Sequence, residues 1–146
     1  MLSIYLDTCC LQRPLDDQRQ PRIRVETEAV LAVLAVVQAG EAMMVTSDVL
    51  EYEIRRIPDE SRSYAAMKLL SLASKRLNVT EAVEHKAEML ERQGIHAMDA
   101  LHLALASEYR IDCFTTTDDA LLRKARQSEL HCKPLSIFEL LLELAP

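Results

Sequence analysis

The chain has 146 residues, enough for one domain that buries about two-thirds of the surface its unfolded form exposes. Apolar residues make up 49% and charged residues 27% of the chain, a balance that excludes a disordered protein. The net charge of −6 argues against a general nucleic-acid binder with a basic face. No apolar run is long enough to span a membrane and no basic flank precedes the first one, so we expect neither an anchor nor a signal peptide.

The four cysteines show no spacing typical of a zinc site. Cys9 and Cys10 are adjacent rather than part of a C-x-x-C motif, and Cys113 lies within an apolar run. We therefore expect free, mostly buried thiols and a reducing, cytoplasmic environment.

Strand and helix patterns alternate in the first half of the chain. Leu2–Leu6 is a continuous apolar run typical of a buried strand, and a broad apolar stripe marks Arg24–Gln38 as a helix that Gly40 ends. Pro58 would end the next helix. In chain order, we predict a strand at Leu2–Leu6, a polar loop at residues 8–21, a helix at Arg24–Gln38, a strand at Met43–Thr46 and a short helix capped by Ser47 or Asp48.

The alternation continues in the second half. Thr80 has the chemistry of an N-cap, and the segment His96–Tyr109 is apolar almost all round, which is typical of a central, buried helix. In chain order, we predict a helix from Asp59 or Ser61 to about Ala73, a strand at Arg76–Val79, helices at Glu81–Arg92 and His96–Tyr109, a strand at Cys113–Thr116, a helix at Asp118–Arg126, a strand at Lys133–Leu135 and a helix at Ile137–Leu144.

This alternation of strands and helices favours a parallel sheet covered on both faces. The chain contains no internal repeat, low-complexity tract or linker. The sequence therefore predicts a three-layer α/β/α sandwich with a central, mainly parallel sheet, formed by a single domain over residues 1–146.

Four acids stand where a predicted strand stops or a predicted helix begins. Asp7 follows LSIYL, Asp118 follows CFTTT, Asp99 opens the stripe of HAMDALHLALA, and Glu53 lies in TSDVLEYEI, where Glu51 competes with it. Ligands of open α/β sheets bind outside the carboxyl ends of the strands. Carboxylates gathered there would repel one another unless a cation lay between them, and hard divalent cations prefer oxygen. The sequence therefore predicts a metal-dependent enzyme, with phosphodiester chemistry as the first candidate.

The acids also have structural interpretations. Asp7 could form a turn or cap a helix, and Asp99 could interact only with a helix dipole. One of Asp118 and Asp119 should cap the helix that follows. We take Asp118, nearer the strand end, as the site residue and Asp119 as the cap or an outer partner.

Histidines offer a rival metal site. His96, Asp99 and His102 are three residues apart along one predicted helix, so that they share a face and could bind a transition metal. Alternatively, His102 only donates a hydrogen bond to the acid. We rank this site below the carboxylate cluster.

Four short motifs resemble those of PIN domains. They are YLDT at the N-terminus, the serine-to-glutamate spacing from Ser47 to Glu53 with Ile54 next, DALHLALA from Asp99, and TTTDDALL around Asp118. They occur in the family's order and span the chain from end to end. PIN domains are metal-dependent ribonucleases, many of them toxins of the VapC type. The resemblance favours Glu53, because the family's glutamate stands six residues after a serine and before an aliphatic residue.

The resemblance implies an endoribonuclease that cleaves single-stranded or structured RNA, as the toxin of a type II toxin–antitoxin pair. It implies one or two Mg²⁺ or Mn²⁺ ions, a cognate antitoxin and a homodimer. Cys9 departs from the family, which often has Asn or Ser at that position. The residues implied in the site are the metal ligands and catalytic acids Asp7, Glu53, Asp99 and Asp118, supported by Thr8, Thr116 and Asp119.

Two other classes of protein share part of this pattern. A haloacid-dehalogenase-like phosphatase needs a second Asp two residues after the first, where Cys9 stands. A catalytically weak PIN-like module that binds RNA or protein is the alternative function, although the loss of an acid would mark it and all four acids are present. Basic residues cluster at positions 13–24 and 55–62; a solvated surface is the simple interpretation, and a few members could contact phosphates.

Overall fold

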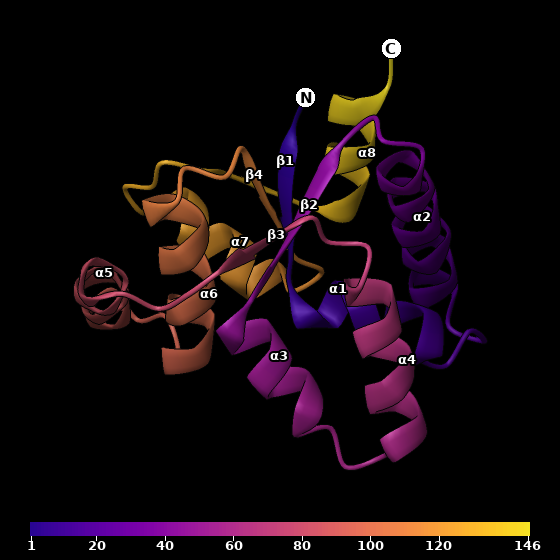
Figure 1. The fold of residues 1–146 in the computed structure, drawn as a ribbon, viewed down its shortest axis with the longest axis horizontal. Helices are drawn as coiled ribbons and strands as arrows, with labels where there is room; N and C mark the ends of the chain where they lie inside the picture. The colour runs from indigo at the N-terminus through magenta and orange to yellow at the C-terminus, as the bar shows by residue number, and fades with distance from the viewer.

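Five strands form one sheet at the centre of the computed structural model, which describes residues 1–146 (Figure 1). They are β1 (Ser3–Leu6), β2 (Met43–Ser47), β3 (Lys75–Leu77), β4 (Cys113–Thr115) and β5 (Lys133–Leu135). All neighbours are parallel, in the order β3-β2-β1-β4-β5, so the first strand of the chain is central. Leu6, the last residue of β1, pairs with Thr115, the last residue of β4. The carboxyl ends of these strands therefore meet at one edge.

Helices cover both faces of the sheet. They are α1 (Thr8–Gln12), the 3-10 turn η1 (Arg13–Leu15), α2 (Pro21–Gln38), α3 (Asp48–Arg55), α4 (Glu60–Leu70), α5 (Glu81–Arg92), α6 (Ala97–Glu108), α7 (Asp119–Arg126) and α8 (Ile137–Leu144). In Figure 1, α2 and α8 pack together on one side of the sheet and α5 and α6 on the other, while α3 and α4 extend beyond the carboxyl ends of the strands. The predicted three-layer α/β/α architecture is confirmed. No helix is both long and apolar enough to cross a bilayer.

The core holds β1 and α6 in fixed positions. Ile4 and Tyr5 of β1 are fully buried, as the apolar run predicted. Leu103 and Leu105 of α6 are also fully buried, which confirms the predicted central helix. Each such side chain stabilises the fold by about 1.5–3 kcal/mol relative to an exposed one. Packing therefore fixes the first turn of α6, where Asp99 lies.

The predicted loop at residues 8–21 is wrong in its first half. Thr8–Gln12 form α1, and η1 follows directly. A side-chain oxygen of Asp7 accepts a hydrogen bond from the backbone N–H of Thr8 at 2.8 Å and so caps this short helix. The helix α2 begins at Pro21, three residues earlier than predicted, because a proline at the first helical position has no intrahelical hydrogen bond to lose.

The other boundaries agree with the sequence predictions to within a few residues. The largest differences are at α4, which ends at Leu70 rather than near Ala73, and at β3, which covers Lys75–Leu77 rather than Arg76–Val79. Ser47 caps α3, since its Oγ accepts from the backbone N–H of Leu50 at 3.0 Å.

Candidate active site

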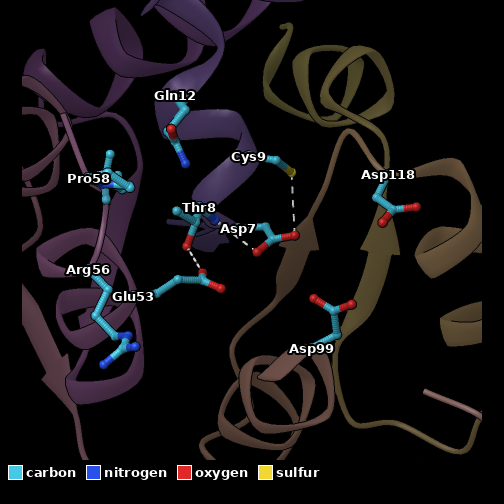
Figure 2. Close-up of a pocket in the computed structure, with 10 residues that line it drawn as sticks. Asp7, Thr8, Cys9, Gln12, Glu53, Arg56, Pro58, Asp99 and Asp118 are labelled. Carbon is cyan, nitrogen blue, oxygen red and sulfur yellow. Dashed lines mark hydrogen bonds between the residues drawn. The ribbon is translucent and has the colours of Figure 1, made fainter. Parts of the chain in front are cut away.

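An open cleft of about 510 Å³ lies at the carboxyl edge of the sheet (Figure 2). It contains all four acids that the sequence singled out, although they come from separate parts of the chain: Asp7 follows β1, Glu53 lies on α3, Asp99 on α6, and Asp118 follows β4. Glu51 does not line the cleft; its carboxylate pairs with Arg76 at 3.0 Å. The structure therefore separates the two competing glutamates and places Glu53 with the other acids.

Asp7 is held at the bottom of the cleft. The residue is only 6% exposed, and both of its carboxylate oxygens accept hydrogen bonds. The backbone N–H of Thr8 donates to Oδ1 at 2.8 Å, and the hydroxyl of Thr116 donates to Oδ2 at 2.9 Å. Cys9 lies beside it, with its Sγ 3.4 Å from Oδ2. The orientation of Asp7 is thus fixed by its neighbours on β1–α1 and β4.

Glu53 contacts Thr8 and His102, and for His102 we had expected a contact with Asp99 instead. The hydroxyl of Thr8 donates to its Oε1, and Nε2 of His102 lies 3.0 Å from the same oxygen. His102 is fully buried, on the same helix as Asp99 but turned towards Glu53. One ligand atom each from Asp7, Glu53 and His102 lies within 4.8 Å of the others. His96 is not part of this group, so the rival trio of His96, Asp99 and His102 does not form.

A buried chain of polar groups connects His102 to the start of α3. The Oγ of Ser47 accepts from the N–H of Leu50 and lies 2.9 Å from the hydroxyl of Tyr5. That hydroxyl lies 2.6 Å from Nδ1 of His102. If each hydroxyl donates onward, Nδ1 is an acceptor and Nε2–H donates to Glu53, so one tautomer satisfies the whole chain. The sequence did not single out Tyr5, which has the pattern of a core residue of a strand, and it placed His102 beside Asp99 rather than Glu53.

The local environment keeps Glu53 ionised. Burial raises the pKa of Glu53, but the hydrogen bonds from His102 and Thr8 outweigh it, so that the pKa lies below its usual value. Burial lowers the pKa of His102, but the hydrogen bond to Glu53 and the charge of Asp7 raise it by more, so that the pKa lies above its usual value. Burial raises the pKa of the Tyr5 hydroxyl well above its usual value, so it stays protonated.

Among the acids of the cleft, Asp99 has a raised pKa, which reflects its burial and the negative charges around it. Burial and the charges of Asp7, Asp118 and Glu53 raise the pKa of Asp99 to about 6, against a smaller lowering by His102. A carboxyl that resists ionisation beside other carboxylates gains most from a cation placed between them. The donors that converge here are mainly carboxylate oxygens, which suit a hard divalent ion such as Mg²⁺ or Mn²⁺. The chemistry of the cleft therefore fits a metal site.

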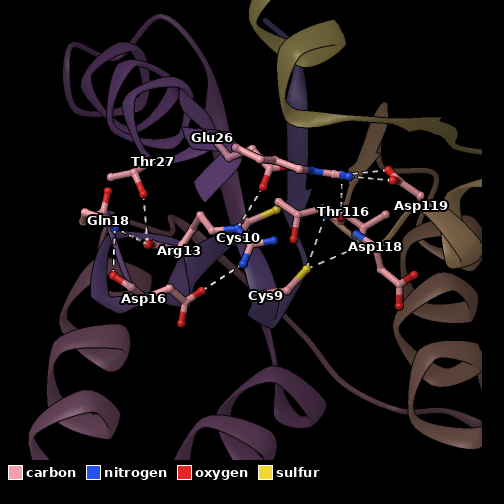
Figure 3. A network of polar contacts seen from close by, with 12 residues as sticks. Cys9, Cys10, Arg13, Asp16, Gln18, Glu26, Thr27, Thr116, Asp118 and Asp119 are labelled. Carbon is pink, nitrogen blue, oxygen red and sulfur yellow. Dashed lines mark hydrogen bonds and ion pairs between the residues drawn. The ribbon is translucent and has the colours of Figure 1, made fainter. Parts of the chain in front are cut away.

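Asp118 lines the cleft as predicted, and it is also the cap of the helix that follows, a role for which we had favoured Asp119. Asp118 is the N-cap of α7, where its Oδ1 accepts from the N–H groups of Ala120 and Leu121 at 3.0 and 3.1 Å. It also lines the cleft, and its Oδ2 has no hydrogen-bond partner in the protein. Asp119 lies outside the cleft and binds Arg22 through both oxygens, at 2.7 and 2.8 Å (Figure 3). Of the two roles predicted for Asp119, a cap or an outer partner, the cap was wrong, because Asp118 has the extended backbone that a cap requires.

The fold and the cleft together define an α/β domain with an acidic, oxygen-rich site at the carboxyl edge of a parallel sheet. The chain matches the family model of the PIN domain over residues 4–142 and belongs to that family. No curated protein matches it.

Two solved structures share this fold. One is VapBC2 from Rickettsia felis, bound to a DNA fragment from their promoter, with a TM-score of 0.59, 10% identity and coverage of 92% of this chain and 98% of that one. The other is PAE2754 from Pyrobaculum aerophilum, with a TM-score of 0.58, 15% identity and coverage of 98% and 89%. At these identities the likeness extends to the fold.

Proposed function

We propose that the protein is a metal-dependent endoribonuclease that hydrolyses phosphodiester bonds in RNA. The observation that carries the proposal is the convergence of Asp7, Glu53, Asp99 and Asp118 in one cleft, where burial and the charges of the other acids raise the pKa of Asp99 to about 6. Membership of the PIN domain family supports it, since PIN domains are generally nucleases. A weak binding module would not need to retain four crowded carboxylates that destabilise its own fold.

Asp7, Asp99 and Asp118 are the proposed ligands of Mg²⁺ or Mn²⁺, with Glu53 as a ligand or a partner of a bound water. When bound, such an ion lowers the pKa of a water and offsets charge on a phosphate. The protein's own groups prepare the site: Thr116 and the backbone of Thr8 orient Asp7, whereas His102 and the hydroxyl of Thr8 hold Glu53 in its ionised form.

We further propose that the protein is the toxin of a type II toxin–antitoxin pair, acting in the cytoplasm. The VapBC2 structure supports this through its shared fold, and four free cysteines suit a reducing compartment. The exposed apolar side chains of Val25, Leu31 and Tyr64 are where we expect an antitoxin or a second copy of the chain to bind. The mass of the purified protein by light scattering tests the homodimer.

The proposed activity is tested with purified protein and a mixed pool of single-stranded RNAs, in Mg²⁺, in Mn²⁺ and in EDTA. We expect cleavage that needs the metal and falls by roughly a hundred- to a thousandfold in Asp118→Asn. The matched control is Asp119→Asn, the neighbouring acid outside the cleft, which should cleave like the wild type. Cleavage in EDTA, or an equal effect of the two substitutions, would contradict the proposal.

A further inference from the structure

Most arginines near the cleft are neutralised by acids, but Arg56 is not. Arg55 pairs with Glu51, and Arg62 binds Asp16 at 2.7 Å. Arg56 lines the cleft and forms no ion pair or side-chain hydrogen bond, although Glu53 lies one turn earlier on the same helix. All five of its N–H donors are therefore available to a ligand.

Arg56 contacts the ring of Tyr52 rather than a carboxylate. Its guanidinium lies over this ring, 5.4 Å from the centroid, and the tyrosine is half exposed. Figure 2 shows Arg56 and Pro58 on one side of the cleft, with Asp99 and Asp118 on the other. The only cation of the cleft is thus placed at one end of the group of acids.

A second cation lies beyond the opposite end. A smaller cavity of about 110 Å³ shares Asp99 and Asp118 with the main cleft and is also lined by His96 and Lys124. The Nζ of Lys124 donates to the carbonyl of Gly94 at 2.9 Å, which fixes its position and leaves two of its three N–H donors free. Lys124 forms no ion pair, whereas Arg126 on the same helix binds Glu139.

The two cavities share Asp99 and Asp118 as lining residues, so a path from one to the other runs past the acids and has at each end one cation that pairs with no acid. A polyanion is repelled by the acids and attracted at both ends, so a chain of phosphates lies best along this path. Asp7, at the bottom, is only 6% exposed, so a phosphate reaches it only if the strand enters the cleft. A single strand can do so, because its bases are free to turn away, whereas a duplex holds its backbone rigidly.

We propose that Arg56 and Lys124 bind phosphates of one single-stranded RNA on either side of the acidic centre. This inference rests on the proposed function and assigns the substrate's path through the site. The neighbouring side chains that contact the strand would be Gln12 and Tyr52 at the Arg56 end and His96 at the Lys124 end.

The test measures binding of a fluorescently labelled single-stranded RNA by anisotropy, with Mg²⁺ present and in the Asp99→Asn background, so that the RNA is not cut. Arg56→Gln and Lys124→Gln should each raise the Kd by roughly three- to tenfold. Each should also reduce the slope of log K against log salt by about 0.7, the value for one lost phosphate contact on a single strand. Their matched controls are Arg55→Gln and Arg123→Gln, adjacent residues of equal charge that line neither cavity.

Equal losses in the test and control variants would mean that only net charge matters, and would overturn the inference. So would unchanged binding in Arg56→Gln and Lys124→Gln, the absence of any RNA binding, or equal binding of a duplex of the same sequence. The inference and the proposed function fail separately. If RNA binding follows this pattern but the wild type does not cleave RNA, the proposed nuclease activity is contradicted. If the wild type cleaves RNA but both variants bind it unchanged, only the proposed roles of Arg56 and Lys124 are contradicted.

Discussion

Two neighbouring regions differ in whether their acids form ion pairs with arginine. Around η1 and α2, the acids that are not exposed are paired with arginines: Glu26, which is 2% exposed, lies between Arg13 at 3.0 Å and Arg22 at 3.3 Å, and Asp16 binds both Arg13 and Arg62 (Figure 3). In the cleft, four acids share a single cation that pairs with none of them (Figure 2). The chain has the means to neutralise buried carboxylates and does so a few residues away. The uncompensated charge of the cleft is therefore best explained by a cation from outside.

The comparison also explains the long, charged segment after α1. The sequence predicted only a polar loop for this segment. Its charges instead form ion pairs that join η1 to α2 and α4, through Arg13 and Arg62. It is part of the framework that holds the wall of the cleft.

The largest effect is expected from breaking the paired region. Glu26→Gln removes the charge that faces two arginines, and breaking a buried pair in this way should cost about 3 kcal/mol of unfolding free energy. Urea denaturation at pH 7 measures the change. The control, Asp17→Asn, breaks the exposed pair with Arg19 and should leave the midpoint unchanged. If Glu26→Gln were as stable as the wild type, the ion pairs of Glu26 with Arg13 and Arg22 would not stabilise the fold, and the contrast between the two regions would be contradicted.

A smaller loss is expected from Tyr5→Phe. This substitution keeps the ring, leaves Nδ1 of His102 without a partner and leaves Oγ of Ser47 with only the N–H of Leu50, which should cost about 2 kcal/mol. Because His102 then holds Glu53 less firmly, the metal concentration for half-maximal activity should rise by roughly tenfold. A destabilised variant with unchanged metal dependence would show that the polar chain serves the fold alone. The comparison variant is Phe114→Leu, which perturbs the same packing without removing a hydroxyl.

The smallest effect has the opposite sign. Asp99→Asn should stabilise the metal-free protein by about 1 kcal/mol at pH 7.5, an amount discounted for the partial exposure of Asp99. The sign follows from the pKa, which is raised to about 6 in the fold: the folded state holds the proton longer than the unfolded state, so the wild type loses stability as the pH rises from about 4 to about 6. The advantage of Asn should therefore fade as the pH falls towards 4. Urea midpoints at several pH values in EDTA measure this difference in stability. If Asp99→Asn were less stable than the wild type at pH 7.5, the claim that burial and neighbouring charges disfavour ionised Asp99 would be contradicted.

The sequence predicted the elements and singled out Asp7, Asp99 and Asp118 from local patterns, whereas only the resemblance to PIN domains favoured Glu53 over Glu51. An acid directly after an apolar strand has its place fixed by the strand, and this brought Asp7 and Asp118 to the same edge. The contacts of His102 depend on packing between residues 97 positions apart, as in its contact with Tyr5, which no local pattern reports. The helix α1 was missed because its 5 residues are too few for a helical period, although Asp7 before Thr8 was a usable capping signal. Asp118 and Asp119 both suit a cap, and only the backbone geometry distinguishes them.

The most direct measurement is the melting temperature of the metal-free protein as Mn²⁺ is added, for the wild type, Asp99→Asn and Asp119→Asn. If the cleft is a cation site, the wild type and Asp119→Asn should rise together, by about 5–10 °C at a hundredfold excess of Mn²⁺ over its Kd. Asp99→Asn should start higher and rise little. Equal rises in all three proteins, or none in the wild type, would contradict the claim that the uncompensated carboxylates exist to bind a metal.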